Sequence, residues 1–160
     1  MLIWKQRGKN FKNMKYFAYG SNMSADRMTK RGVNFSSRKF AKLNGYKLVF
    51  NKKSKTKNEA YANIIESDND VVEGVLYEFP NEKISILDKY EDYPNGYCRK
   101  ELVVIDENSN SITATVYIAQ NDKIVEGMYP TQSYLGYLLE GKDLLSEEYF
   151  ECLEQTKTCD

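Results

Sequence analysis

Short runs of aromatic and β-branched residues recur along the chain, and turn-forming residues separate them. In the run VVEGVLYEF, over residues 71–79, alternation puts Val75, Tyr77 and Phe79 on one face of a strand. Further strands are predicted by the runs over residues 15–19, 41–51 (with a bulge at Gly45), 60–65, 97–105 and 112–119. So many strands with few helices between them argue against a doubly wound parallel sheet. They favour an α+β fold, a curled or closed, barrel-like mixed sheet with a few flanking helices.

Capping residues and helical periodicity predict four helices. Ser24 is a suitable N-cap for a helix over residues 25–31. A second helix is expected to open at Pro80 and to run to about Tyr93, where Pro94 stops it. Two closing helices are expected over residues 131–139 and 146–153.

The length of 160 residues is sufficient for one domain with its own core. We expect a single domain over residues 15–156, an N-terminal tail or upstream start over 1–14, and a C-terminal tail over 157–160. The N-terminal segment over residues 1–14 lacks the sustained apolar region of a secretory signal. No apolar run approaches the roughly 18 residues of a membrane span, so no membrane partner is expected.

The cysteines are odd in number and lack CxxC spacing, which argues against a disulfide framework or a zinc site. A reduced, cytoplasmic setting is therefore expected for Cys98, Cys152 and Cys159. Histidine is absent, which excludes Ser-His-Asp triads, Cys-His dyads and histidine-ligated metals.

Charge is balanced overall but not along the chain. Lys+Arg and Asp+Glu both number 23, so the net charge is zero, which argues against a nucleic-acid partner. Residues 1–57 nevertheless carry a charge of +15, and residues 58–160 carry −15. Two interpretations stay open: a basic functional face, or one compact domain that mixes the two halves.

The stretch YFAYGSNM, Tyr16–Met23, predicts a strand, a glycine turn and the start of a helix. Main-chain N–H groups at such a junction have no partners inside the helix, and they favour a carboxylate or a developing oxyanion. Gly20 allows close approach to the main chain, and Ser21 and Asn22 add side-chain donors. An ordinary corner capped by Ser and Asn is the other interpretation.

Glu91 falls on the same helical stripe as Ile84 and Leu87, whereas Asp88 falls mainly off it and is expected to face solvent. Burial and the negative end of the helix would raise the pKa of Glu91, which suits a carboxyl group for acid/base work. A rotated helix that leaves Glu91 as an exposed surface acid is the alternative.

Together these features resemble the γ-glutamylcyclotransferase-like family, which includes AIG2-like and BtrG-like proteins. The stretch YFAYGSNM is similar to the signature loop of that family, and the family's later motifs follow in order over most of the chain. They correspond to the segments GYKLVF (45–50), ANI (62–64), GVLY (74–77), LDKYE (87–91) and NGYCR (95–99). Two departures are Asp92, where the family commonly has glycine, and the stretch over residues 58–61, which lacks a glycine.

The resemblance implies an enzyme that cyclises a small-molecule γ-glutamyl substrate to 5-oxoproline and releases an amine or amino acid, without metal or cofactor. It implies that Glu91 is the catalytic acid/base. The implied substrate-binding residues are Tyr16, Phe17, Ala18, Tyr19, Gly20, Ser21, Asn22 and Tyr117. Asp92 adds a negative charge beside Glu91, which would either raise the pKa of Glu91 further or draw it toward solvent.

Other functions stay open at this point. A non-catalytic binding or regulatory protein would keep the same fold, and a single-strand nucleic-acid binder would use the basic, aromatic-containing stretch over residues 38–57. A monomer and a homodimer are both compatible with the sequence. The leaving group is open too, although the acidic second half weakly favours a cationic one.

Overall fold

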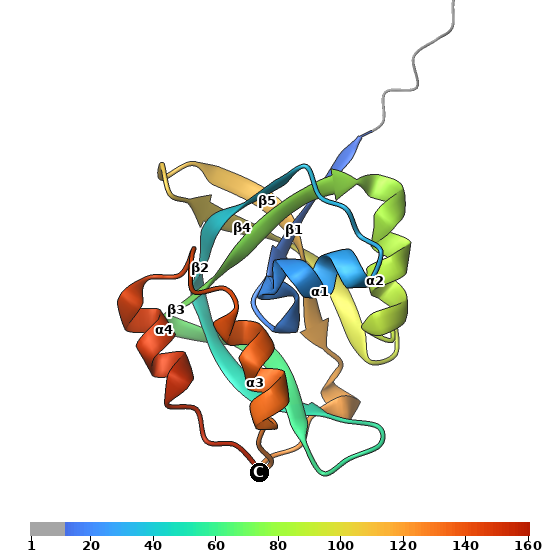
Figure 1. Ribbon diagram of the computed structural model, residues 1–160, viewed down its shortest axis with the longest axis vertical. Coiled ribbons are helices and arrows are strands. Elements are labelled where there is room, and N and C mark those ends of the chain that lie inside the picture. Colours follow the sequence, from blue (N-terminus) through green and yellow to red (C-terminus); the bar gives the residue numbers. More distant parts are fainter. Residues whose placement is uncertain (1–11) are drawn as a thin grey trace, which may run out of the picture.

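The computed structural model describes residues 12–160, so the expected N-terminal tail as far as residue 11 lies outside the described residues. Five strands form one closed barrel in the order β1-β3-β2-β4-β5 (Figure 1). They are β1 (Asn13–Ala18), β2 (Ser37–Lys53), β3 (Ala60–Pro80), β4 (Tyr97–Asp106) and β5 (Ser111–Ala119). A parallel pairing of Tyr16 with Thr115 joins β1 to β5 and closes the barrel, whereas the other neighbours are antiparallel. The expected closed, mixed sheet is confirmed.

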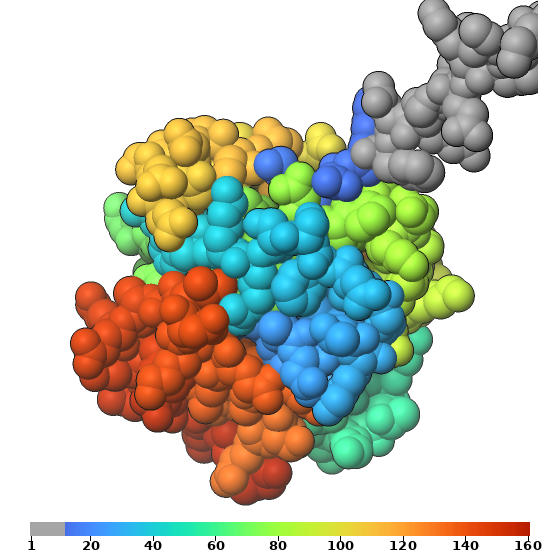
Figure 2. Space-filling view, turned by 45° about the horizontal axis from the view of Figure 1, so that its top comes forward, coloured from blue at the N-terminus to red at the C-terminus, as the bar shows by residue number. Residues whose placement is uncertain are grey.

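The helices flank this barrel. They are α1 (Ala25–Lys30), α2 (Ile84–Tyr90), α3 (Gln132–Leu139) and α4 (Glu147–Glu154), with short 3-10 segments η1 (Ser21–Met23), η2 (Asn81–Lys83) and η3 (Asn121–Lys123). The hydroxyls of Ser24, Thr131 and Ser146 cap α1, α3 and α4 by accepting a main-chain N–H bond three residues later. Figure 2 shows α1, in blue, bordered by the orange C-terminal part of the chain. Within residues 12–160 no helix is long and apolar enough to cross a membrane.

The prediction of two separate strands over residues 60–65 and 71–79 is wrong, because both belong to the single strand β3. Its pairing with β2 passes from Tyr46 opposite Glu66 to Asn44 opposite Val71, so residues 67–70 have no partner in β2. Gly45, at a φ of 80°, forms the expected bulge on the other strand. The polar run SDND, residues 67–70, is therefore an irregularity within one continuous strand and does not separate two strands.

The second predicted helix is also shorter than expected. It begins with η2, α2 ends at Tyr90, and Glu91 is its C-cap residue. Asp92 has a φ of 50°, a left-handed conformation that ends the helix two residues before Pro94. Glu91 is thus fixed at a helix end instead of along a helix face.

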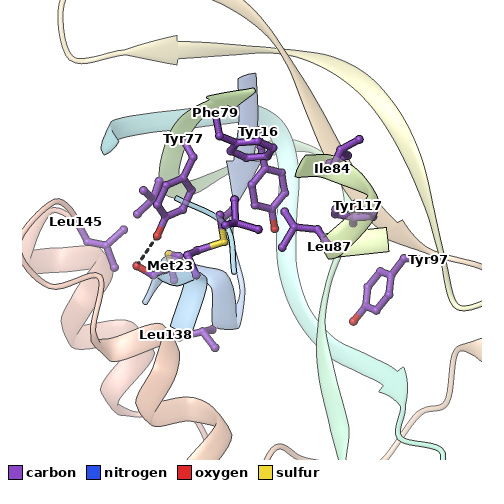
Figure 3. Close-up of a cluster of buried hydrophobic side chains, with 14 of the residues drawn as sticks. Tyr16, Met23, Tyr77, Phe79, Ile84, Leu87, Tyr97, Tyr117, Leu138 and Leu145 are labelled. Atoms are coloured by element: carbon purple, nitrogen blue, oxygen red, sulfur yellow. Dashed lines mark hydrogen bonds between the residues drawn. The ribbon is translucent and has the colours of Figure 1, made fainter. Parts of the chain in front are cut away.

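Two hydrophobic clusters bury opposite faces of β1. One cluster comes almost wholly from strand residues, among them Phe17, Leu43 and Val116, and fills the barrel. The other lies between the outer face of the barrel and the helices, as Figure 3 shows. Its members include Tyr16, Met23, Val75, Tyr77, Phe79, Leu87 and Leu138, so the predicted common face of Val75, Tyr77 and Phe79 is confirmed.

Ion pairs join the basic and acidic halves of the chain. Four of them pair a cation before residue 58 with an acid after it: Arg31–Glu91, Arg38–Asp143, Lys39–Asp106 and Lys55–Asp92. This supports the interpretation that the two halves mix within one compact unit.

Gly74 is required where β3 passes β1. A Cβ atom at this position would overlap the Ala18 carbonyl oxygen and lie 2.8 Å from the Phe17 ring. We expect Gly74→Ala to lower the free energy of unfolding by about 1–3 kcal/mol, since overpacking displaces neighbouring atoms. Urea unfolding measures this loss of stability, with Gly136→Ala in α3 as the control. Apart from its chain neighbours and the backbone of its own helix, nothing lies within 4 Å of the added methyl there, and alanine stabilises a helix relative to glycine. Equal midpoints for the two variants would contradict this packing account.

Candidate active site

The glycine turn after β1 runs close to β3 and α3. A Cβ atom on Gly20 would lie 3.2 Å from the Ala62 Cβ and 3.4 Å from the Tyr134 hydroxyl oxygen, so the main chain approaches its neighbours closely here. The bonds that close η1 run from the Met23 N–H to the Gly20 carbonyl and from the Ser24 N–H to the Ser21 carbonyl. The N–H groups of Ser21 and Asn22, one turn earlier, therefore have no helical partner, as the sequence predicts.

Glu91 is brought to this turn by the end of α2. Its N–H donates to the Leu87 carbonyl, and its carbonyl accepts from the Tyr97 N–H at 3.2 Å, which ties the helix end to β4. Leu87 is fully buried, Ile84 nearly so, and the side chain of Glu91 is 16% exposed. Ile84, Leu87 and most of Glu91 are thus buried as predicted, although Glu91 is the C-cap residue and not part of the helix face. Glu91 is not an exposed surface acid.

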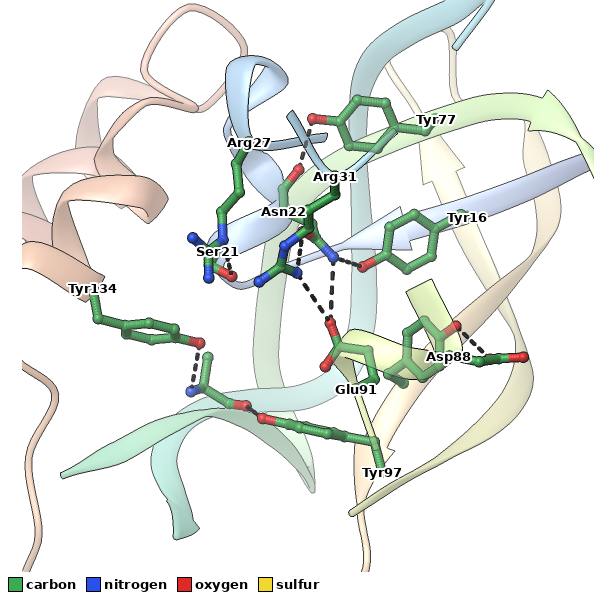
Figure 4. Close-up of polar contacts among 12 residues, drawn as sticks. Tyr16, Ser21, Asn22, Arg27, Arg31, Tyr77, Asp88, Glu91, Tyr97 and Tyr134 are labelled. Carbon is green, nitrogen blue, oxygen red and sulfur yellow. Dashed lines mark hydrogen bonds and ion pairs between the residues drawn. The ribbon is translucent and has the colours of Figure 1, made fainter. Parts of the chain in front are cut away.

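Asn22 connects Glu91 to the turn (Figure 4). Its side-chain Nδ2 donates to the Tyr16 hydroxyl at 3.0 Å and to Glu91 Oε1 at 3.3 Å. Its Oδ1 accepts from Arg31 Nη1 at 2.9 Å, and the same Nη1 lies 3.9 Å from Glu91 Oε1. Every polar atom of the Asn22 amide is thus used, which fixes its orientation and leaves the second carboxylate oxygen of Glu91 for another partner.

Burial raises the pKa of Glu91 above the ordinary value of 4.5. The positive charges of Arg31, Lys52 and Arg27 and the hydrogen bond from Asn22 act in the opposite direction but do not cancel the effect of burial. Asp92 points to Lys55, at 2.9 Å, and this pairing lowers the pKa of Asp92. Glu91 is thus kept from solvent while its neighbour is held at the surface.

Two adjoining cavities meet at Glu91. The inner cavity, of about 30 Å³, is lined by Tyr16, Tyr19, Gly20, Ser21, Asn22, Ala62, Glu91, Tyr97, Tyr117 and Tyr134. The outer cavity, of about 300 Å³, shares Ser21, Glu91, Tyr97 and Tyr134 with it. Most residues that the sequence singles out therefore surround one space. Phe17 and Ala18 are not among its lining residues, and their side chains are almost completely buried in the two hydrophobic clusters.

The tyrosines of the inner cavity already have hydrogen-bond partners. The Tyr19 hydroxyl donates to the Tyr117 carbonyl at 2.6 Å, and the Tyr117 hydroxyl donates to Asp88 Oδ1 at 2.7 Å. The expectation that Asp88 faces solvent is wrong, since its side chain is only 20% exposed and also pairs with Arg99. These tyrosines form rigid walls around the cavity.

Several lining residues have no role in the sequence-based prediction. Arg27 in α1 and Arg31 at the C-cap of α1 both line the outer cavity. The rings of Tyr137 and Tyr90 stack on their guanidinium groups. Their i, i+4 spacing directly after the turn is a signal that sequence analysis can use. Lys52 is hidden in the basic stretch 38–57, whose aromatics Tyr46 and Phe50 pack against the core. Within residues 12–160, no cluster of three His, Cys, Asp or Glu side chains has the arrangement of a metal site.

Comparisons with known proteins agree with this geometry. The family model described as "Gamma-glutamyl cyclotransferase, AIG2-like" matches residues 16–136. A Bos taurus protein named gamma-glutamylcyclotransferase is 32% identical over 133 residues, which cover 80% of this chain and 69% of that protein. A Homo sapiens protein of the same name is 29% identical over 154 residues, covering 92% and 80%. A solved structure named "Gamma-glutamyl cyclotransferase" superposes with a TM-score of 0.82 at 28% identity, covering 93% of this chain and 90% of that chain.

The raised pKa of Glu91 has a consequence for stability. Folding favours the protonated carboxyl group, so its ionisation destabilises the folded state as pH rises through the folded pKa, and this cost is absent well below 4.5. We expect Glu91→Gln to raise the free energy of unfolding at neutral pH and to leave it nearly unchanged well below pH 4.5. Urea unfolding at both pH values measures this, with the exposed Glu126→Gln as the control. A variant that is no more stable than the wild type at neutral pH would contradict the account.

Proposed function

Because this chain belongs to the gamma-glutamyl cyclotransferase, AIG2-like family, we propose that its two cavities carry out the cyclisation with Glu91 as the acid/base. The enzyme converts a γ-glutamyl group to 5-oxoproline and releases an amine or amino acid. The observation that carries the proposed role is that the largely buried Glu91 carboxylate lines both cavities and faces the Gly20–Asn22 turn. With no histidine in the chain, this carboxylate is the suitable proton carrier.

The size of the inner cavity suggests which part of the substrate enters it. A volume of about 30 Å³ admits only a few atoms, and a single water needs roughly 10–15 Å³. We assign this space to the γ-carbonyl oxygen, with the N–H groups of Ser21 and Asn22 as donors to the oxyanion that develops there. The rest of the substrate extends into the outer cavity, where Arg27 and Arg31 offer positive charge to the glutamyl α-carboxylate.

The reaction begins when Glu91 takes a proton from the α-ammonium of the substrate. The freed amine attacks the γ-carbonyl carbon, which forms a five-membered ring and an oxyanion. Glu91 returns the proton to the leaving nitrogen, and the bond between that nitrogen and the γ-carbon breaks. The ring nitrogen then loses its extra proton to the same carboxylate, and the released amine takes it up. Two protons thus pass from one nitrogen to the other, and the tether between nucleophile and carbonyl supplies their proximity.

We also propose where in the cell the enzyme acts and which residues form its catalytic domain. The cysteines Cys98, Cys152 and Cys159 are all free thiols, which is compatible with a reducing, cytoplasmic location. A small-molecule γ-glutamyl compound is the substrate, and no membrane or nucleic acid takes part. Residues 15–156 act as one catalytic domain, as a monomer or a homodimer.

Glu91→Gln tests the proton carrier. Removing a general acid/base typically costs about 10²–10⁴-fold in rate, so 5-oxoproline release from a γ-glutamyl substrate is expected to fall by that factor. Circular dichroism should show an unchanged fold, because the amide oxygen of glutamine still accepts the Asn22 hydrogen bond. The exposed Glu126→Gln is the matched control. Wild-type turnover in the Glu91 variant would refute the mechanism.

Arg31→Met tests the electrostatics of the same carboxylate. Among the cations, Arg31 has the largest lowering effect on the pKa of Glu91, so its loss raises that pKa further. Because the base acts when ionised, the acidic limb of the pH profile of kcat/KM should move to higher pH. Lys30→Met, at an exposed lysine next to it, should leave the limb in place. An unmoved limb in the Arg31 variant would show that another group titrates there.

A further inference from the structure

Lys52, near the end of β2, is the only lysine among residues 12–160 with a buried side chain, and it is 5% exposed. Its Nζ donates one hydrogen bond, to the Lys53 carbonyl at 3.0 Å, and lies 5.3 Å from the centre of the Tyr97 ring and 5.9 Å from that of Tyr61. Across residues 12–160, no carboxylate comes within ion-pair distance of it. A buried ammonium group without an anionic partner is costly, and the bond to the Lys53 carbonyl uses one of its three donors, with no other acceptor for it in the described part of the chain.

Lys52 lines the outer cavity, whose charge is mainly positive. Lys55 is already paired with Asp92, and Glu91 is the proposed base, so neither acid is available to a cationic ligand. The weak expectation of a cationic leaving group, based on the acidic second half of the chain, does not agree with this cavity. Its chemistry suits a ligand that brings negative charge.

The cations of the outer cavity stand on two walls. Figure 4 shows Arg27 and Arg31 on one side of Glu91, next to the turn, and Tyr97 on the other side. Lys52 lies against Tyr97, so it belongs to the wall that faces the arginines. The arginine wall adjoins the turn at which the proposed reaction takes place, and Lys52 is left for the other end of the substrate.

We propose that Lys52 is a specificity-determining residue of this enzyme: it binds the carboxylate of an amino-acid leaving group, a contact that γ-glutamyl amines without this carboxylate cannot make. The inference rests on the proposed function and adds a specificity-determining residue to it. A carboxylate entering the cavity completes an ion pair that the folded chain leaves open, with the buried ammonium already held in position by Lys53 and the two tyrosine rings.

Two substrates that differ only in this carboxylate test the proposal. γ-Glutamyl-alanine and γ-glutamyl-ethylamide share the glutamyl group and the leaving-group carbon chain, and 5-oxoproline release measures kcat/KM for both. A charge-assisted bond at this site predicts about a 10- to 100-fold preference of the wild type for γ-glutamyl-alanine. In Lys52→Met this ratio should fall to near one. Lys53→Met, at the exposed neighbouring lysine, should keep the wild-type ratio.

The possible results separate the specificity role from a structural one. If Lys52 only packs on the tyrosines, or binds the glutamyl α-carboxylate, its loss lowers kcat/KM equally for both substrates, and the proposal is overturned. Equal rates of the wild type on both substrates overturn it too. If Lys52→Met does not fold, Lys52→Gln and Lys52→Arg decide: the proposal requires the preference to be lost in the first and kept in the second. Release of 5-oxoproline from neither substrate by the wild type refutes the proposed function itself, and the inference with it.

Discussion

The hydrogen bonds of Asn22 are the interaction on which the arrangement of this site depends. The side-chain amide joins Tyr16, Glu91 and Arg31, and the main-chain carbonyl of Asn22 accepts from the Tyr77 hydroxyl at 2.7 Å. Asn22 itself is 3% exposed, and its bonds with the Tyr16 and Tyr77 hydroxyls are buried, whereas those with Glu91 and Arg31 are partly buried. One residue thus fixes the glycine turn against the barrel and supplies the donor that keeps a largely buried carboxylate in place.

The barrel topology makes this contact possible. β1 pairs with β3 on one side and closes on β5 on the other, so the turn that follows β1 lies over one end of the barrel. β3 leads directly into η2 and α2, and the Tyr97 N–H bond to Glu91 returns the chain to β4. Because β3 is antiparallel to β1, β3 ends beside the first residue of β1, at the far end from the turn. The segment η2 and helix α2 then lead back and bring Glu91 to the turn. The close passage of β3 at Gly74 is part of the same geometry, since a Cβ atom there would overlap the Ala18 carbonyl oxygen at the end of β1.

Local signals predicted much of this structure, and long-range contacts explain what they missed. The alternation of Val75, Tyr77 and Phe79 and the cap at Ser24 are properties of neighbouring residues, and both are confirmed. That Glu91 lies beside the turn was expected only from the resemblance to a family. The 3.6-residue period by itself predicts no more than that Glu91 shares a helical stripe with Leu87. The continuity of β3 was missed since it depends on β2, where Gly45 lets the partner strand bulge opposite a polar run. The burial of Asp88 and of Lys52 depends on Tyr117 and on Tyr97, which are distant in sequence.

The central claim is that Glu91 exchanges protons with the substrate nitrogen while the turn at Ser21 and Asn22 holds the γ-carbonyl oxygen. A crystal structure of the Glu91→Gln variant with γ-glutamyl-alanine bound tests it most directly, because this substrate should stay intact. The account predicts that the substrate α-nitrogen lies within hydrogen-bond distance of the side chain at position 91, with the γ-carbonyl oxygen directed at the N–H groups of Ser21 and Asn22. A bound substrate whose α-nitrogen points away from position 91, or whose γ-carbonyl lies outside the inner cavity, would contradict it.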